Sequence, residues 1–99
     1  MADVLTVVIK GFEEIHKFMG RPEITVAKVI RLGGGDPSQG KAIATILGEL
    51  SRRKYLKQVA RHGNRIAYVE RVHVSKTDII NAYNEVISKK YSSKIKFEK

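Results

Sequence analysis

The stretch DPSQGKAIATILGELSRRK, residues 36–54, decides the fold of this 99-residue chain, and YLKQVARHGNRIAYVERV continues it to residue 72. The first stretch predicts a long helix over residues 37–54. Asp36 can cap this helix, Pro37 suits its first position, and Gln39 stands three residues after the cap. Apolar residues then recur at helical spacing and predict the buried side of the helix, namely Ile43, Ile46, Leu47 and Leu50.

The second stretch changes from the helical period to a period of two. Residues 55–60 and 66–72 are rich in β-branched and aromatic side chains, and Gly63 with Asn64 lies in the turn between them. Two such runs joined by a Gly-Asn turn predict a β-hairpin. The hairpin tyrosines would either pack across the strands or stack on exposed bases, and we favour packing for both Tyr55 and Tyr68.

Two further helices are expected before the long helix. Residues 3–19 carry apolar side chains at a spacing of three and four, from Leu5 to Met19, which predicts an amphipathic helix that ends at Gly20. The Val and Ile content of residues 23–32 would suit a strand, but their spacing fits a short helix better, and Thr25 can cap it.

Glycines separate the second helix from the long one, and a last helix follows the hairpin. Gly33, Gly34 and Gly35 predict a break, because three glycines in a row are costly in any regular element. Ser75 and Asp78 predict the start of the last helix. Its expected buried stripe is Ile79, Ile80, Tyr83, Val86, Ile87 and Tyr91, and residues 92–99 are expected to form a short, basic, mobile tail.

Composition narrows the class of protein. Hydrophobic residues make up 42% of the chain, which is typical of a folded domain, and a chain this short favours one core. There is no cysteine, so disulfides and cysteine-bound zinc are excluded. No apolar run approaches the roughly 20 residues of a membrane span. We therefore expect a cytoplasmic protein, and its net charge of +9 favours a polyanion such as nucleic acid as partner.

Most of this charge lies in one segment. Residues 52–71 hold seven Lys and Arg against one acid, a balance of 7 − 1 = +6, whereas the first 51 residues hold six of each sign. The last 28 residues hold six lysines against three acids, a balance of +3. Such clustering is typical of a local binding surface rather than of an evenly solvated basic protein.

The order of these elements resembles the winged-helix family of helix-turn-helix domains. Ile24–Leu32 would be the first helix of the motif, Gly33–Pro37 the turn, Pro37–Lys54 the recognition helix, and Tyr55–Ala60 with Arg65–Val72 the wing. The resemblance implies an α+β, mainly helical fold. It would have a three-helix core, a two-stranded β-wing and an additional C-terminal helix, forming a single domain over residues 1–91.

The resemblance also implies binding of double-stranded DNA, most commonly in transcriptional regulation. On a helical wheel, the side opposite the apolar stripe is polar, carries no acid and has small residues in its middle, as a helix entering a major groove requires. Arginines at the hairpin tip would enter a minor groove or hold a phosphate. The candidate nucleic-acid-binding residues are Ser38, Lys41, Thr45, Arg52, Arg53, Lys54, Lys57, Arg61, His62 and Arg65.

A second reading keeps the fold but changes the role. The chain would be an accessory subunit of a larger nucleic-acid machine, a polymerase or a ribonucleoprotein, and would dock through protein contacts and a basic patch. Homodimers through the N- and C-terminal helices are a further possibility. Their candidate residues, each of which could equally complete the monomer core, are Val4, Val7, Tyr83 and Tyr91.

Enzymatic and metal chemistry find little support in the sequence. Residues 35–41 match the phosphate-binding pattern G-x-x-x-x-G-K, but Ala42 replaces the hydroxyl residue that would bind magnesium. His16, His62 and His73 lie far apart in the sequence and form no recognisable metal site. No pair of catalytic carboxylates stands out, so we expect no enzyme, no cofactor and no metal.

Overall fold

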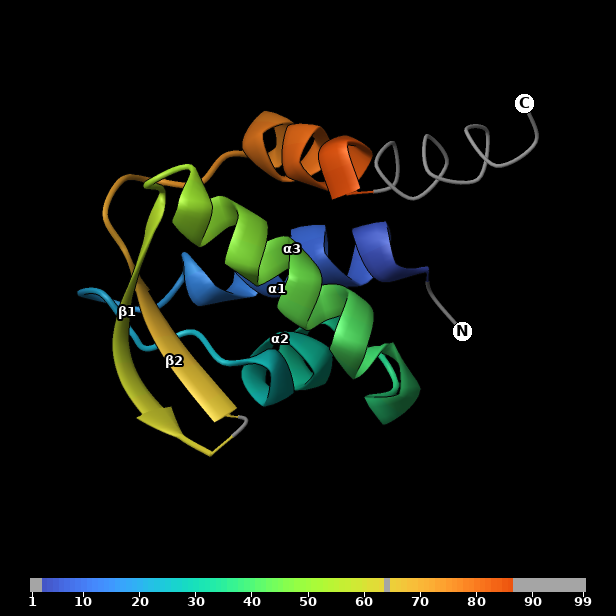
Figure 1. Ribbon diagram of the computed structural model, residues 1–99, viewed down its shortest axis with the longest axis horizontal. Helices are drawn as coiled ribbons and strands as arrows, with labels where there is room; N and C mark the ends of the chain where they lie inside the picture. The colour runs from blue at the N-terminus through green and yellow to red at the C-terminus, as the bar shows by residue number, and fades with distance from the viewer. Residues whose placement is uncertain (1–2, 64, 87–99) are drawn as a thin grey trace, which may run out of the picture.

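The computed structural model describes residues 3–63 and 65–86, and Figure 1 shows the arrangement of the elements. In chain order they are α1 (Val4–Ile15), α2 (Val26–Gly33), the 3-10 turn η1 (Pro37–Gln39), α3 (Gly40–Arg52), β1 (Leu56–His62) and β2 (Arg65–Glu70). A further helix covers residues 76–86. The described residues thus form an α+β fold that is mainly helical, with four α-helices and one two-stranded antiparallel sheet.

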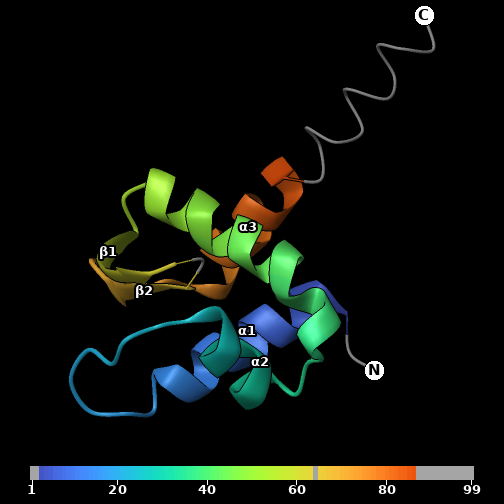
Figure 2. The same ribbon diagram turned by 60° about the horizontal axis from the view of Figure 1, so that its bottom comes forward.

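The core lies where α3 crosses α1 and α2. In Figure 1 α3 passes in front of α1, and in Figure 2 it lies above both α1 and α2, so that one face of α3 is turned away from these two helices. The four apolar residues predicted for its inner face are all buried, which confirms that prediction. They meet a buried set from α1 that consists of Val7, Val8, Phe12 and Ile15.

Helix α1 is shorter than the predicted span of 3–19. It begins after Asp3, whose side chain accepts a hydrogen bond of 2.8 Å from the Thr6 backbone N–H, and it ends at Ile15. Beyond that residue the chain makes turn-type bonds, such as the one of 3.1 Å from the Phe18 N–H to the Ile15 carbonyl. Met19 is 97% exposed, so the apolar pattern continues past the part of the helix that has a core to pack against.

Residues 26–33 are helical, which confirms the choice of helix over strand for most of this segment. The Thr25 side chain accepts a hydrogen bond of 3.1 Å from the Lys28 N–H, as predicted for the cap. The three glycines do not all lie outside the helix, because Gly33 is its last residue and only Gly34, with a φ of 73°, turns the chain away. Ile24 keeps strand character, as described below for its contact with the hairpin.

The two ends of α3 differ from the predicted span of 37–54. Asp36 and Gln39 form the predicted reciprocal cap, but the first turn is the 3-10 turn η1 and the α-helix proper starts at Gly40. It ends at Arg52, because Lys54 has a φ of 71°. The Tyr55 N–H then donates to the Leu50 carbonyl at 3.0 Å, a helix ending that glycine usually provides.

The β-hairpin is confirmed, with shifted bounds. β1 and β2 pair antiparallel, and the register shifts between Gln58 and Ala60, which leaves Val59 in a bulge. Arg61 and His62, predicted in the turn, are the last residues of β1, because their ladder partners Ile66 and Arg65 continue the pairing.

The second strand of the hairpin is shorter than predicted, and both hairpin tyrosines pack on the core. β2 ends at Glu70 rather than at the predicted Val72. Tyr68 is buried in the core and Tyr55 packs against it, which confirms packing for both. The backbone N–H of Ile24 donates to the Tyr68 carbonyl at 2.6 Å, and the Tyr68 N–H donates to the Ile24 carbonyl at 2.8 Å. The segment before α2 therefore pairs with β2 through an isolated antiparallel β-bridge.

The last helix starts as predicted. Ser75 and Asp78 exchange hydrogen bonds of 3.0 and 3.1 Å, and Ile79 is buried. Ala82, which the predicted stripe omitted, is also fully buried because this helix packs closely on the core. The predictions for Ile87, Tyr91 and the tail of residues 92–99 lie outside the described residues.

Two of the residues considered for a homodimer belong to the edge of the core, and one to its centre. Val7 is completely buried within the chain, so it has no surface to offer a second copy. Val4 and Tyr83 are half-buried and pack against the same core.

Among the described residues, none of the helices combines the length and the apolar character needed to cross a membrane.

We predict that Gly33→Ala destabilises the protein strongly. A Cβ at residue 33 would overlap the Val7 carbonyl oxygen and would stand 2.9 Å from its carbonyl carbon, so α1 and α2 would have to separate. We expect a loss of at least about 2 kcal/mol in the free energy of unfolding, measured by urea denaturation. The matched control is Gly48→Ala, where a Cβ meets nothing within 4 Å and helix propensity should add about 0.5–1 kcal/mol. Equal effects of the two variants would contradict the close packing of α1 on α2.

Candidate nucleic-acid interface

The outer face of α3 and the 3-10 turn η1 before it hold the predicted helix residues. Ser38, Lys41, Thr45 and Arg52 are exposed, and Gly48 among them is half-buried. This face is opposite the buried stripe and, in Figures 1 and 2, is turned away from α1 and α2. The helix can therefore present polar side chains to a partner without disturbing the core.

The Thr45 side chain on this face is oriented by a hydrogen bond to the backbone of α3. Its hydroxyl donates a hydrogen bond of 2.9 Å to the backbone carbonyl of Lys41, one turn earlier. A hydroxyl whose hydrogen is used in this way can still accept a hydrogen bond through its oxygen. In this rotamer Thr45 therefore suits a partner that donates, such as the amino group of a base, better than a phosphate oxygen.

Glu49 joins the two arginines at the end of α3. Its carboxylate accepts bonds of 3.0 Å from Nε and 2.7 Å from Nη2 of Arg52, and a third of 2.8 Å from Nε of Arg53. Glu49 is only 8% exposed, whereas the Arg52 side chain is 62% exposed and that of Arg53 is 29% exposed. Glu49 therefore lies beneath its two arginine partners, and α3 itself carries no exposed carboxylate at this end.

The electrostatics of this cluster follow from its geometry. The hydrogen bonds from Arg52 lower the pKa of the Glu49 carboxyl most, burial opposes them, and Arg53 adds to the lowering, so that the pKa falls from 4.5 to about 2. Glu49 is therefore ionised throughout the neutral range. The same hydrogen bonds raise the pKa of Arg52, to which Glu85 on the last helix also contributes through space.

The junction between α3 and β1 exposes Lys54 in an uncommon backbone conformation. Among the described residues other than glycine, it alone has a positive φ. This conformation costs a residue with a Cβ about 1–2 kcal/mol relative to ordinary helical geometry. It turns the chain directly from the arginines at the end of α3 into the strand that carries Lys57.

The hairpin adds the remaining predicted cations. Lys57, Arg61, His62 and Arg65 are all exposed. His62 and Arg65 face each other as the last pair of the ladder, and Arg61 donates a hydrogen bond of 3.3 Å to the carbonyl of Gly63 in the turn. Arg61, His62 and Arg65 therefore lie at the tip of the hairpin, and Lys57 lies near the start of β1.

Together α3 and the hairpin form a surface almost without exposed acid, which we call the α3–hairpin surface. Residues 37–69 contain one acid, Glu49, against seven Lys and Arg, and Glu70, the last residue of β2, is half-buried and paired with His16. Because Glu49 is buried and already paired, this surface has a positive potential over both elements.

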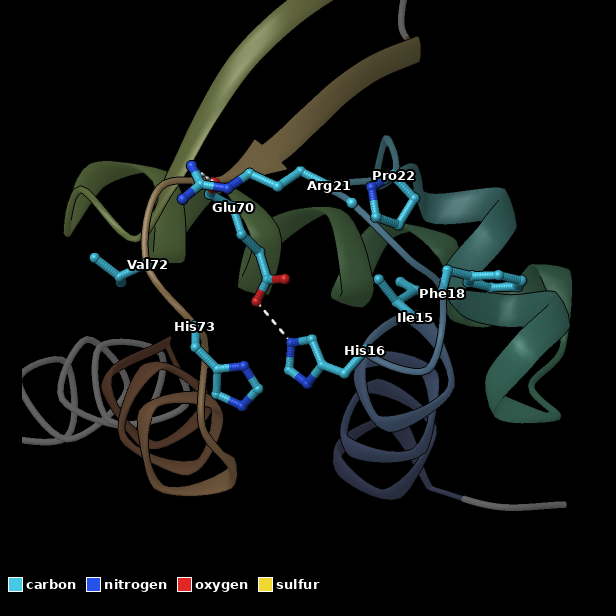
Figure 3. A pocket seen from close by; sticks show the side chains of 9 residues that line it. Ile15, His16, Phe18, Arg21, Pro22, Glu70, Val72 and His73 are labelled. Carbon is cyan, nitrogen blue, oxygen red and sulfur yellow. Dashed lines mark hydrogen bonds and ion pairs between the residues drawn. The ribbon is translucent and has the colours of Figure 1, made fainter.

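A second cluster, which sequence reasoning missed, lies at the other end of β2. His16 at the end of α1 and Glu70 at the end of β2 meet at 2.7 Å, and the ring of His73 lies over that of His16 with centroids 4.0 Å apart. Figure 3 shows these three side chains pointing toward one another. The signal was absent from the sequence because 54 residues separate His16 from Glu70.

This cluster ties three segments together. The Glu70 carboxylate oxygen that meets His16 also accepts a bond of 2.9 Å from the Val74 backbone N–H, and Arg21 donates to the Glu70 carbonyl at 3.1 Å. The cluster lines a pocket of about 220 Å³, to which Phe18 and Val72 add apolar side chains and α3 contributes no residue. Within the described part of the chain, no group of three or more His, Asp or Glu side chains is placed to hold a metal ion.

The segment that matches the phosphate-binding pattern has a different structural context here. It follows helix α2 and continues through η1 into α3. In nucleotide-binding proteins the corresponding loop follows a strand of a parallel sheet. No strand stands before it among the described residues, so the match gives no support for nucleotide binding.

Comparison with known proteins adds no relative. No family model, curated protein or solved structure matches the chain.

We predict that the Glu49 cluster makes stability depend on pH in the acid range. Because the folded-state pKa lies below the ordinary value, the contribution of Glu49 is complete above about pH 4.5 and is lost as the pH falls toward about 2. Glu49→Gln should lower the free energy of unfolding at pH 7 by about 1–2 kcal/mol, since the exposure of Arg52 to water weakens the full effect of the pKa shift.

Urea denaturation at pH 7, 4 and 2.5 measures this effect. The difference between wild type and Glu49→Gln should shrink as the pH falls, and a difference that stays constant would contradict the assignment. Glu14→Gln is the control, because its ion pair with Lys17 is exposed and should contribute far less.

Proposed function

We propose that this chain is a winged-helix protein that binds double-stranded DNA through the α3–hairpin surface and that it regulates transcription. The observation that carries the proposal is the charge of that surface. Seven cations lie on α3, on the hairpin and in the junction between them, and the acid among them, Glu49, is buried and paired. Phosphate backbones bind such surfaces with an affinity that depends strongly on salt.

The order of the elements supports the winged-helix assignment. Two short helices precede α3, the hairpin follows it directly, and a last helix returns to the core. This order is compatible with the family resemblance noted in the sequence. In such a fold α3 would enter the major groove, and the hairpin would lie along the neighbouring backbone.

The shape of the outer face also favours a groove. The middle of that face holds Thr45 and Gly48, and its longer side chains, Lys41 and Arg52, stand near its two ends. A helix about 10–12 Å across with its side chains fits the major groove, which is about 12 Å wide. Small residues at the centre allow base edges to approach the helix.

A second candidate function, that of an accessory subunit in a larger nucleic-acid assembly, is favoured by a different observation. Phe18 and Val72 are exposed apolar residues that line the pocket near His16, the exposed Met19 follows Phe18 in the chain, and α3 contributes nothing to this pocket. Exposed apolar groups that gather in one place favour protein contacts. A pull-down from native lysate with and without nuclease separates the two functions: an accessory subunit keeps its protein partners after nuclease treatment, and a DNA-bound regulator loses the proteins held through DNA.

The hairpin should contribute directly to duplex affinity. We predict that the double variant Arg61→Ala/Arg65→Ala weakens binding to all duplexes and makes the slope of log K against log salt less steep by about 1–2, as expected for the loss of one or two phosphate contacts. Fluorescence anisotropy with a labelled duplex at several salt concentrations measures both quantities. The control is Lys10→Ala/Lys17→Ala, which removes the same charge from α1 and should change the slope much less. Equal slopes for the two double variants would exclude the hairpin from the interface.

Gly48 should separate stability from binding. We predict that Gly48→Ala, which is expected to stabilise the helix, weakens duplex binding several-fold, because the added methyl group stands on the outer face where the base edges would approach. Thermal unfolding and anisotropy on the same preparation measure the two effects. A variant that is more stable and binds DNA as well as the wild type would show that the groove does not meet this part of α3.

A further inference from the structure

The geometry of Arg52 is unusual for a side chain on a positively charged surface. Its guanidinium is held side-on, with Nε and Nη2 both donating to the Glu49 carboxylate. A guanidinium is a rigid plane with five N–H donors. The side-on pair uses two of them and leaves the outer edge, formed by Nη1 and the second hydrogen of Nη2, outside the pair.

Glu49 is itself held firmly enough to act as a support. It is 8% exposed, and it is also bonded to Arg53, whose side chain is more deeply buried than that of Arg52. Glu49 and Arg53 are therefore fixed by the packing of α3, whereas the Arg52 side chain extends from them into solvent. The plane of the Arg52 guanidinium is set before any ligand arrives.

Two kinds of acceptor pair on DNA match such an edge, and the charge of the cluster distinguishes them. The two free oxygens of a phosphate and the N7 and O6 atoms of guanine both accept two parallel N–H donors. A phosphate contact depends mainly on charge, which Glu49 reduces. A base contact depends on direction, which Glu49 supplies. A buried acid in the middle of the surface therefore favours the base contact.

We propose that Arg52, oriented by Glu49, reads a guanine in the major groove, and that Glu49 is the positioning residue for this contact. The proposal rests on the proposed duplex-binding function and assigns to that function one base of the preferred site. Arg53 and Lys57, by contrast, supply charge to the backbone.

The experiment has two stages. Selection from a random duplex pool gives the preferred site of the wild type, and anisotropy then compares duplexes in which each G·C pair of that site is changed to A·T. One such change should weaken wild-type binding by roughly 5- to 150-fold, the range for one bidentate contact between arginine and guanine.

Three variants identify the residue responsible. Arg52→Lys keeps the charge but lacks the planar edge, so it should lose the preference at that base pair and retain binding to the changed duplex. Glu49→Gln should lose most of the same preference while it binds all duplexes more tightly at low salt. Lys57→Ala, the matched control, should weaken binding to every duplex alike and keep the preference.

The outcomes separate this inference from the function on which it rests. If no duplex is bound with salt-dependent affinity, the proposed function itself is wrong. If duplexes are bound but Arg52→Lys and Glu49→Gln keep every base preference of the wild type, the function stands and the guanine contact is overturned. Thermal unfolding of each variant shows whether it is folded, and the exposed Arg52 keeps the test decisive even if Glu49→Gln unfolds.

Discussion

The placement of the hairpin depends on one short backbone contact, the pairing of Ile24 with Tyr68. Two hydrogen bonds of 2.6 and 2.8 Å join these residues, and both side chains are buried in the core. A two-stranded hairpin alone is marginally stable in water, so β1 and β2 need such an attachment to hold a fixed direction. Because the same segment leads into α2, the contact sets the hairpin relative to the helices against which α3 packs. Together with the buried side chains of Leu56 and Tyr68, this pairing holds the hairpin beside α3.

Glu49 shows how charge is used on that surface. A surface built only for nucleic-acid affinity would carry no acid, since every carboxylate reduces the attraction for phosphate. Burying a carboxylate is also costly unless it is paired. Glu49 is buried, triply bonded and strongly acidic, so its cost is offset by the two arginines that it holds. An acid in that position lowers the attraction of the surface for phosphate but fixes the orientation of Arg52 and Arg53.

Most of the fold could be predicted from local signals in the sequence. The caps at Thr25, Asp36 and Ser75 and the apolar spacing of α3 depend on neighbours within one or two turns, and each prediction was confirmed. The bounds of α3 and of the hairpin differ by a few residues, and the largest error came where distant residues decide. Helix α1 stops at Ile15 because the core ends there, although the apolar pattern continues to Met19.

For the candidate site too, local features could be predicted from the sequence and long-range contacts could not. Exposure of the cations followed from the wheel and from the hairpin pattern, because these are local properties. The Ile24 contact with Tyr68 and the cluster of His16, Glu70 and His73 join residues more than 40 positions apart, for which one sequence carries no signal.

Three departures from local backbone preference lie within residues 48–59, on α3, on β1 and in the junction between them. Gly48 weakens the middle of a helix although no neighbour lies within 4 Å of where its side chain would be, Lys54 adopts a positive φ that glycine would accept freely, and the bulge at Val59 interrupts β1. The core shows no comparable conflict among the described residues, since even Gly33 is required there by the approach of Val7. Sequences that fold well are consistent at every level, and their exceptions concentrate where function imposes a different demand. These three exceptions within residues 48–59 agree with the proposal that the α3–hairpin surface is the binding site, by a criterion that does not use charge.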